Sequence, residues 1–259
     1  AGTAVVLGEK AAMFVDGRYT LQVRDQVDGA LYEFCDYPAT QPAQWLAEHV
    51  EAGQRIGYDP WLHTRDWVAS TRAQLAAKGA ELVAVEDNPI DAVWQDRPAP
   101  SLAPAQPHAL GYAGKSHEEK LDDIAAWLKT RGADAAVLSA LDSVAWALNI
   151  RGSDVARTPV ALSYAIAKAD GTLDLFIAPE KVTDALRGHL GNRVAIRDRA
   201  LFELALQNEF GGQAVAVDPE RAVAAIFAAL EGGGARVDAV RDPVVLAKAI
   251  KNPVEIAGH

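Results

Sequence analysis

The strongest constraint on the fold is a regular alternation of short apolar runs with longer amphipathic segments. The short runs have the length and the β-branched content of strands, whereas the longer segments repeat apolar residues at helical spacing. Such alternation is typical of a layered fold in which helices cover the faces of a sheet. We therefore predict an α/β protein.

A proline-rich stretch at residues 88–114 divides this pattern into two halves. It contains Asp96-Arg-Pro-Ala-Pro100 and Pro104-Ala-Gln-Pro107, which can continue neither a helix nor a central strand. A chain of 259 residues, half of them hydrophobic, is long enough for two domains of ordinary size. We predict a first domain over residues 1–114, including the connection, and a second over residues 115–259.

Each half is predicted to combine a β-hairpin with alternating helices and strands. Ala4-Val-Val-Leu7 and Ala11-Ala-Met-Phe-Val15 flank a short turn in the first half. In the second half, Asp170-Gly171 separates two alternating apolar runs, which is a strong turn pattern. Hairpins combined with helical crossovers imply a mixed sheet with helices on its faces in each half.

Two helix boundaries can be placed in the second half. Ser116 with Glu119 three residues later forms a capping box, which predicts a helix that Gly132 ends. Pro253 interrupts the last helical pattern and is tolerated only near a helix start. We therefore predict one helix over Val244 to Lys251 and a second helix from Pro253.

The composition argues against several classes of partner. A formal net charge of -10 does not suit a protein that binds nucleic acid or an anionic membrane, both of which require a basic surface. No apolar run approaches the roughly 20 residues of a membrane-spanning helix. Cys35 is the only cysteine, so the chain cannot form an internal disulfide. We expect a cytoplasmic protein that binds neither nucleic acid nor membrane.

The sequence offers no recognisable catalytic or metal-binding pattern. None of the six histidines is paired at the spacing of a zinc helix, and the carboxylate pairs Glu118-Glu119 and Asp122-Asp123 fit the solvated face of a helix. There is no Gly-x-Ser-x-Gly turn, and Cys35 has no neighbouring histidine to activate it. We assign no catalytic residue and no metal ligand to this chain.

Two polar motifs lie where one element gives way to the next. Asp16-Gly-Arg-Tyr19 follows a predicted strand, and its simplest interpretation is a turn in which the aspartate caps or pairs with the arginine. Asn149-Ile-Arg-Gly-Ser-Asp154 follows a predicted helix, where polar side chains commonly face a cleft. Its structural interpretation is that Asn149 ends the helix and Arg151 pairs with Asp154.

These motifs resemble those of Xaa-Pro aminopeptidases. The resemblance rests on three segments in the same order: Ala1-Gly-Thr-Ala-Val-Val6 with the strand and motif up to Gln22, the apolar segment Leu141 to Val160, and Asp242 to His259. It implies two creatinase amino-terminal-like domains, each a mixed sheet flanked by helices. It also implies a further strand and helix before Ala1, and a metal-binding catalytic domain after His259.

The resemblance implies a function for the present residues. They would form the substrate-gating and subunit-pairing portion of a homodimeric peptidase that removes the residue before a proline in the second position. Arg18 and Tyr19 would contact the peptide, and Arg151 would either contact it or order the interface with the catalytic domain. No cofactor is expected in this chain, because the two divalent ions, commonly manganese, would belong to the catalytic domain.

Two other functions are compatible with the same fold. The first is a noncatalytic module that holds a peptide or a partner protein, which the lack of a catalytic pattern favours. The second is a creatinase-like or prolidase-like hydrolase that shares these domains. The combination of Ala1-Gly-Thr-Ala4, Asp16-Gly-Arg-Tyr19 and Asn149-Ile-Arg-Gly-Ser-Asp154 favours the three-domain aminopeptidase over the creatinase-like and prolidase-like relatives.

Overall fold

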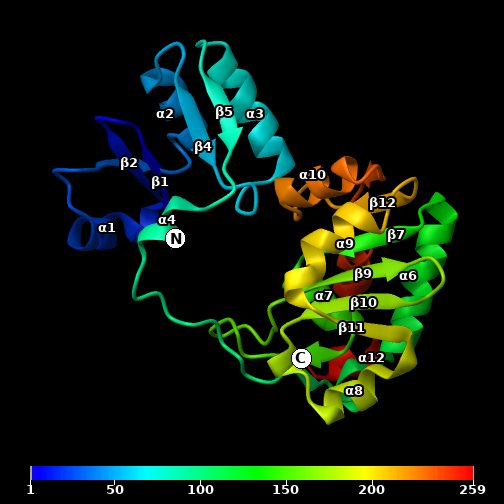
Figure 1. The fold of residues 1–259 in the computed structure, drawn as a ribbon. Helices are drawn as coiled ribbons and strands as arrows, with labels where there is room; N and C mark the ends of the chain where they lie inside the picture. The colour runs from blue at the N-terminus through cyan, green and yellow to red at the C-terminus, as the bar shows by residue number, and fades with distance from the viewer. Residues whose placement is uncertain (1, 259) are drawn as a thin grey trace. The chain divides into compact units, whose positions relative to one another are not determined.

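A computed structural model describes residues 2–258 as two compact units. Unit 1 comprises the chain up to Asp59 and Asp66–Asn88, and unit 2 comprises Pro60–Arg65 and the chain from Pro89 onward. Strands and helices alternate in both units, so the predicted α/β class is confirmed (Figure 1). Residues 60–65 belong to unit 2, although unit 1 precedes and follows them in the sequence.

Within the described residues, unit 1 contains a three-stranded and a two-stranded sheet. The predicted hairpin is present, with Gly2 opposite Val15 and a turn closed by Leu7. The third strand of the larger sheet runs parallel to the second, so this sheet is mixed. In order, the strands are β1 (Gly2–Val6), β2 (Ala11–Val15) and β3 (Glu33–Asp36) in one sheet, and the parallel pair β4 (Arg55–Tyr58) and β5 (Glu81–Ala84) in the other.

A small aromatic core holds the three-stranded sheet. Phe14 meets Trp45 edge to face with ring centroids 6.4 Å apart, and the Trp45 Nε1 donates a hydrogen bond of 3.0 Å to Glu33. Cys35 lies in the same cluster, where it acts as a small buried apolar side chain. The helices of this part of the chain are α1 (Thr20–Gln26), α2 (Pro42–His49) and α3 (Arg65–Ala76).

Unit 2 is built on a mixed six-stranded sheet within residues 2–258. Its central hairpin pairs Ser163 with Ile177 and turns at Asp170-Gly171, where Gly171 takes a φ of +87° that favours glycine. The other strand pairs are parallel, except for one antiparallel pair between β9 (Ser163–Lys168) and its other neighbour, so the sheet is mixed. The strand order is β11 (Val194–Asp198), β10 (Leu173–Ile177), β9, β7 (Ala135–Leu138), β12 (Ala214–Val217) and β13 (Arg236–Ala239).

Helices pack on both faces of this sheet. Side chains alternate along each strand, so Leu175 joins one apolar cluster and Phe176 joins the other. One cluster includes side chains of α6 (His117–Arg131), α7 (Leu141–Ala147), α8 (Asp184–Leu190) and α11 (Val244–Ala249). The opposite cluster includes side chains of α9 (Phe202–Asn208) and α10 (Ala224–Gly232).

The predicted helix boundaries in unit 2 are confirmed except one, because the helix predicted over Val244 to Lys251 ends at Ala249. Ser116 and Glu119 form both hydrogen bonds of the capping box of α6, and Gly132 ends that helix with a left-handed backbone. The proline at position 253 begins α12 (Pro253–Gly258), so the last helical pattern forms two helices.

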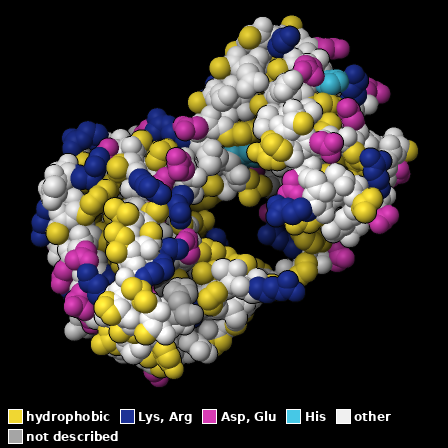
Figure 2. All heavy atoms as spheres, turned by 180° about the vertical axis from the view of Figure 1, so that it is seen from behind, with side chains coloured by type: hydrophobic (Ala, Val, Ile, Leu, Met, Phe, Trp, Pro, Cys, Tyr) yellow, Lys and Arg dark blue, Asp and Glu magenta, His cyan; other side chains and the backbone are white. Residues whose placement is uncertain are grey.

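Short elements occupy the connection between the halves and the polar segment after α7. They are α4 (Pro89–Val93), β6 (Gln106–Pro107), α5 (Leu110–Ala113) and β8 (Ile150–Arg151). Acidic and basic side chains are interspersed on the face drawn in Figure 2. Within residues 2–258, no helix is long and apolar enough to cross a membrane.

Candidate functional site

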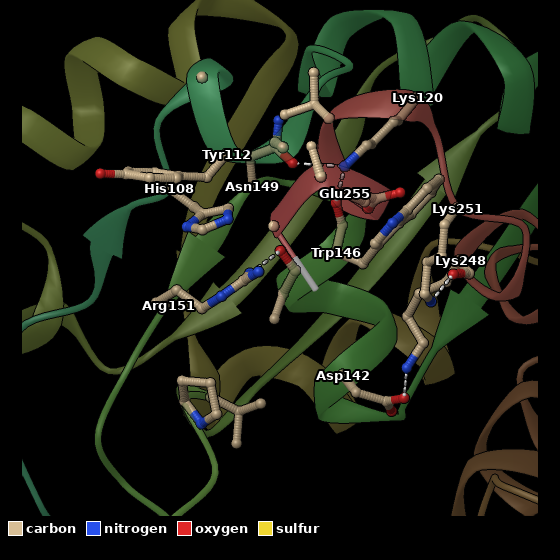
Figure 3. A pocket seen from close by; sticks show the side chains of 18 of the residues that line it. His108, Tyr112, Lys120, Asp142, Trp146, Asn149, Arg151, Lys248, Lys251 and Glu255 are labelled. Atoms are coloured by element: carbon tan, nitrogen blue, oxygen red, sulfur yellow. Dashed lines mark hydrogen bonds and ion pairs between the residues drawn. The ribbon is translucent and has the colours of Figure 1, made fainter.

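A cavity of about 870 Å³ lies in unit 2, beside the polar segment Asn149-Ile-Arg-Gly-Ser-Asp154 (Figure 3). Its size is within the usual range of small-molecule sites. The lining comes from six elements and the loop before β9: α5, α6, α7, β8, α11 and α12, and it includes Lys248 and Lys251. Arg151 lies in this lining, whereas Arg18 and Tyr19 belong to unit 1.

The chain reaches this cavity through a sharp change of direction after α7. Asn149 has a φ of 50°, a left-handed conformation that asparagine adopts more readily than most residues. The next two residues form β8, in which Arg151 pairs with Gln106 of β6. Gly152 then packs against the returning chain, where an added Cβ would lie 2.6 Å from the backbone nitrogen of Ala161. This close approach fixes the position from which Arg151 enters the cavity.

Arg151 is half-buried, and its guanidinium donates to backbone carbonyls. Its Nη1 lies 2.9 Å from the carbonyl oxygen of Ile150 and 3.4 Å from that of Ala145. Burial lowers the pKa of the guanidinium, and the negative charge of Glu255 opposes this effect. Among residues 2–258, Arg151 forms no ion pair, so most of its donors remain available to a ligand.

The expected pairing of Arg151 with Asp154 is wrong. Asp154 instead forms a buried ion pair with Lys181, with 2.5 Å between Oδ1 and Nζ, and also accepts from the backbone nitrogen of Leu162. Burial acts to raise the pKa of the Asp154 carboxyl, but its hydrogen bonds outweigh this effect and the pKa is lowered. Lys181 lies 27 residues away in the sequence, so only the tertiary structure could identify it as the partner.

Lys120 is a buried charged residue of the cavity that lies outside both polar motifs. It is 1% exposed, its Nζ donates to the Asn149 side chain at 2.6 Å and to the Trp146 carbonyl at 3.0 Å, and it lies 4.0 Å from the centroid of the Trp146 ring. Burial lowers the pKa of Lys120 to about 8. It forms no ion pair with another residue in the described range 2–258.

The sequence does contain a signal for Lys120. It precedes Ile124 by one helical turn and Leu128 by two, so it lies on the same apolar stripe of α6 as these buried residues. A lysine on such a stripe needs polar partners from elsewhere in the fold. Asn149 is that partner, and its Nδ2 also donates to the carbonyl of Lys115 at 2.9 Å.

The charges that face the cavity are of both signs. Figure 3 shows Arg151 and Lys120 directed into the cavity from different sides, with Glu255 of α12 near Lys120. Glu255 also accepts from the backbone nitrogen of Asn252 at 3.0 Å and so caps its own helix. Lys248 pairs with Asp142, and Lys251 also belongs to the lining. The lining therefore has four cations and two carboxylates.

His108 contributes a ring to the same wall without adding charge near neutral pH. It stacks on Tyr112 with 5.8 Å between ring centroids. Burial lowers the pKa of His108, and the positive charges of Arg151 and Lys120 lower it further. The wall formed by these two rings is therefore aromatic and polar but uncharged.

Arg18 and Tyr19 lie in a short 3-10 helix, Gly17–Tyr19, between β2 and α1 of unit 1. The Arg18 guanidinium binds both carboxylate oxygens of Asp16, at 3.0 Å from Nε and 2.7 Å from Nη2, and the Asp16 side chain also accepts from the Arg18 backbone. These hydrogen bonds lower the pKa of Asp16 to about 2. The Arg18 side chain is 83% exposed. The turn and pair expected from the motif are present, and Arg18 remains accessible.

The described residues 2–258 do not gather a ligand set for a metal ion. No group of three or more His, Cys, Asp or Glu side chains has a metal-binding arrangement there. Most of the charged side chains that line the cavity are cations, whereas a divalent ion requires oxygen ligands such as carboxylates. The two divalent ions implied by the resemblance do not fit these residues, and no chemical step is assigned to them.

Two sequence families match the chain, and both are described as Creatinase/Prolidase N-terminal domain. One match covers residues 1–93 and the other covers residues 96–255. A probable Xaa-Pro aminopeptidase P of Aspergillus niger is 38% identical over 271 residues, which include the whole of this chain and 44% of the relative. One from Ajellomyces capsulatus is 34% identical over 275 residues, again with 44% of the relative covered.

A solved structure has the same arrangement of elements. It is an X-prolyl aminopeptidase from Caenorhabditis elegans, described as a cytosolic enzyme with a di-nuclear active site, with a TM-score of 0.88 and 30% sequence identity. The alignment covers 99% of this chain and 43% of the worm protein. The chain thus spans less than half the length of the relatives it matches. Because the match over residues 96–255 alone covers more than half of the chain, the chain belongs to the creatinase/prolidase N-terminal domain family.

Proposed function

We propose that this chain is the amino-terminal, two-domain portion of a Xaa-Pro aminopeptidase, which removes the residue that precedes a proline. The observation that supports this proposal best is the alignment of the whole chain with relatives named probable Xaa-Pro aminopeptidase P. The two relatives described above are 38% and 34% identical to it. The catalytic ions, two divalent metals and commonly manganese, would be held outside this chain. The parent enzyme would be a cytoplasmic homodimer.

In this proposal the present residues gate the substrate and help to pair the subunits. Arg18 is exposed and offers a planar set of donors to peptide carbonyls or a carboxylate, and Tyr19 lies beside it. Arg151 supplies a second, half-buried guanidinium whose donors are not used by a carboxylate among residues 2–258. Arg18 would bind peptides with proline in the second position, and Arg151 would either bind them or order the interface with the catalytic domain.

The direct test is hydrolysis of the peptide Arg-Pro-Pro with added Mn²⁺. It compares this chain with the parent protein that contains the remaining length of the relatives. We expect activity only in the parent. Inactivity of both proteins would refute the aminopeptidase proposal, and activity of this chain alone would show that it contains a catalytic site of its own.

The role of Arg18 has its own test in the parent enzyme. We expect Arg18→Gln to raise KM for Arg-Pro-Pro about tenfold with a smaller change in kcat, because a guanidinium that binds substrate and transition state equally affects binding alone. Arg72→Gln, which changes an exposed arginine of α3 in the same unit, is the control. Equal kinetics in both variants would exclude Arg18 from substrate binding.

The alternative is a noncatalytic module that holds a peptide or a partner protein. The favouring observation is that residues 2–258 contain no metal-binding cluster, while unit 2 has a cavity with unpaired cations. This alternative predicts that the parent protein is inactive toward Arg-Pro-Pro, so the hydrolysis experiment also separates the two proposals.

A further inference from the structure

The cavity in unit 2 contains two cations that nothing in the described residues neutralises by direct contact. Lys120 donates to a carbonyl and an amide oxygen, and Arg151 donates to carbonyls, so neither is paired with a carboxylate among residues 2–258. Burying a lysine to 1% exposure without an ion pair is costly. Such an arrangement is typical of sites that bind an anion.

The charge of the lining favours an anion. Its charged side chains are four cations and two carboxylates: Lys120, Arg151, Lys248 and Lys251, with Asp142 and Glu255. Lys248 pairs with Asp142, so the remaining charges have an excess of positive charge. A guanidinium also presents donors in the planar geometry that a carboxylate accepts.

The other walls of the cavity suit an apolar body attached to that carboxylate. Trp146, Tyr112, Pro159 and Val254 all contribute to the lining. The volume of about 870 Å³ is much larger than a simple ion requires. The cavity is therefore large enough for an organic acid.

We propose that this cavity is a binding site for a carboxylate, in which the Arg151 guanidinium and the Lys120 ammonium hold the carboxylate of an organic acid and the aromatic wall packs on its apolar body. The carboxylate can come from a free organic acid or from an acidic side chain elsewhere in the parent protein. Binding to this chain is independent of the peptidase activity proposed above.

The test is a calorimetric titration of this chain with 4-phenylbutyrate and with its neutral analogue 4-phenylbutanamide. We expect the acid to bind at least about tenfold more tightly than the amide, because only the acid can form charged hydrogen bonds with both cations. Arg151→Gln and Lys120→Gln should each reduce the affinity for the acid at least about tenfold and leave the affinity for the amide unchanged.

Two matched variants control for the loss of a charge and for folding. Arg187→Gln on α8 and Lys129→Gln on α6 remove the same charges from exposed positions outside the cavity, and should not alter binding. Circular dichroism of each variant separates loss of binding from loss of fold. Arg151→Gln is less prone to unfold than Lys120→Gln, because Arg151 is only half-buried. Equal binding of acid and amide, or equal losses in Arg151→Gln and Arg187→Gln, would overturn the proposal.

Repeating the titration with the parent protein distinguishes the two sources. Binding of the acid to both proteins would support a free organic acid as the ligand. Binding to this chain but not to the parent would support an acidic side chain of the parent as the occupant of the cavity.

Discussion

At the residue scale, the most unusual feature is a lysine that remains unpaired within the core of unit 2. Burial lowers the pKa of Lys120 to about 8, Glu255 acts to raise it, and Arg151 and Lys115 act to lower it. An ordinary lysine has a pKa of 10.5. The difference corresponds to a penalty of roughly 3 kcal/mol for keeping the charge in the folded chain.

This penalty predicts a specific pH dependence of stability. Between about pH 8 and 10.5 the unfolded chain binds a proton that the folded chain does not, so the free energy of unfolding contributed by Lys120 rises with pH. Relative to Lys120→Met, we expect the wild type to gain roughly 2 kcal/mol between pH 7 and 9.5, measured by urea unfolding. Lys129→Met, on an exposed position of the same helix, is the control. Parallel pH profiles of wild type and Lys120→Met would contradict this assignment.

At the element scale, the turn that brings β8 to the cavity depends on the absence of a side chain at Gly152. An added Cβ would lie 2.6 Å from the Ala161 nitrogen and 2.7 Å from the Val160 oxygen. These are backbone atoms, so the chain itself must shift to make room. The ion pair of Asp154 with Lys181 holds the same turn from within.

We therefore expect Gly152→Ala to lower the free energy of unfolding by about 2 kcal/mol, the usual cost of overpacking. Gly188→Ala on α8 is the matched control, because an added Cβ there has no heavy atom within 4 Å and alanine favours a helix. Urea unfolding of both variants measures the difference. A Gly152→Ala protein as stable as Gly188→Ala would show that this turn can shift at little cost.

At the scale of the whole molecule, residues 60–65 lie between two parts of unit 1 in the sequence but pack in unit 2. Trp61 has ring centroids 6.3 Å from Tyr164 and 6.4 Å from Phe202, and the carbonyl of His63 accepts from the nitrogen of Ala224 at 2.8 Å. Unit 2 therefore includes a segment that lies far from it in the sequence.

This arrangement predicts that Trp61→Ala destabilises unit 2. We expect a loss of about 2 kcal/mol, less than for a fully buried tryptophan, because Trp61 is only partly buried. Trp94→Ala is the control, since Trp94 is 48% exposed. Amide hydrogen exchange in β9 and β10 should be faster in Trp61→Ala than in Trp94→Ala. Equal exchange rates in the two variants would refute the prediction.

The local pattern of the sequence was sufficient to predict most elements of both units. The capping box at Ser116, the turn at Asp170-Gly171 and the helix break at Pro253 each depend on residues close together in the chain, and all three are present in the structure. Strand β3 was missed, because Glu33-Phe-Cys-Asp36 is short and bounded by charges, and it becomes a strand by pairing with β2.

The α/β layers, the hairpins and the polar break that contains Arg151 can be predicted from local sequence, because propensity, periodicity and turn chemistry act over a few residues. Which charges meet depends instead on how distant segments pack. Lys181 takes Asp154 from 27 residues away and Lys120 reaches Asn149 from 29, so Arg151 is left with its donors directed at a cavity. Those partnerships depend on burial and long-range packing, which no short stretch of sequence specifies.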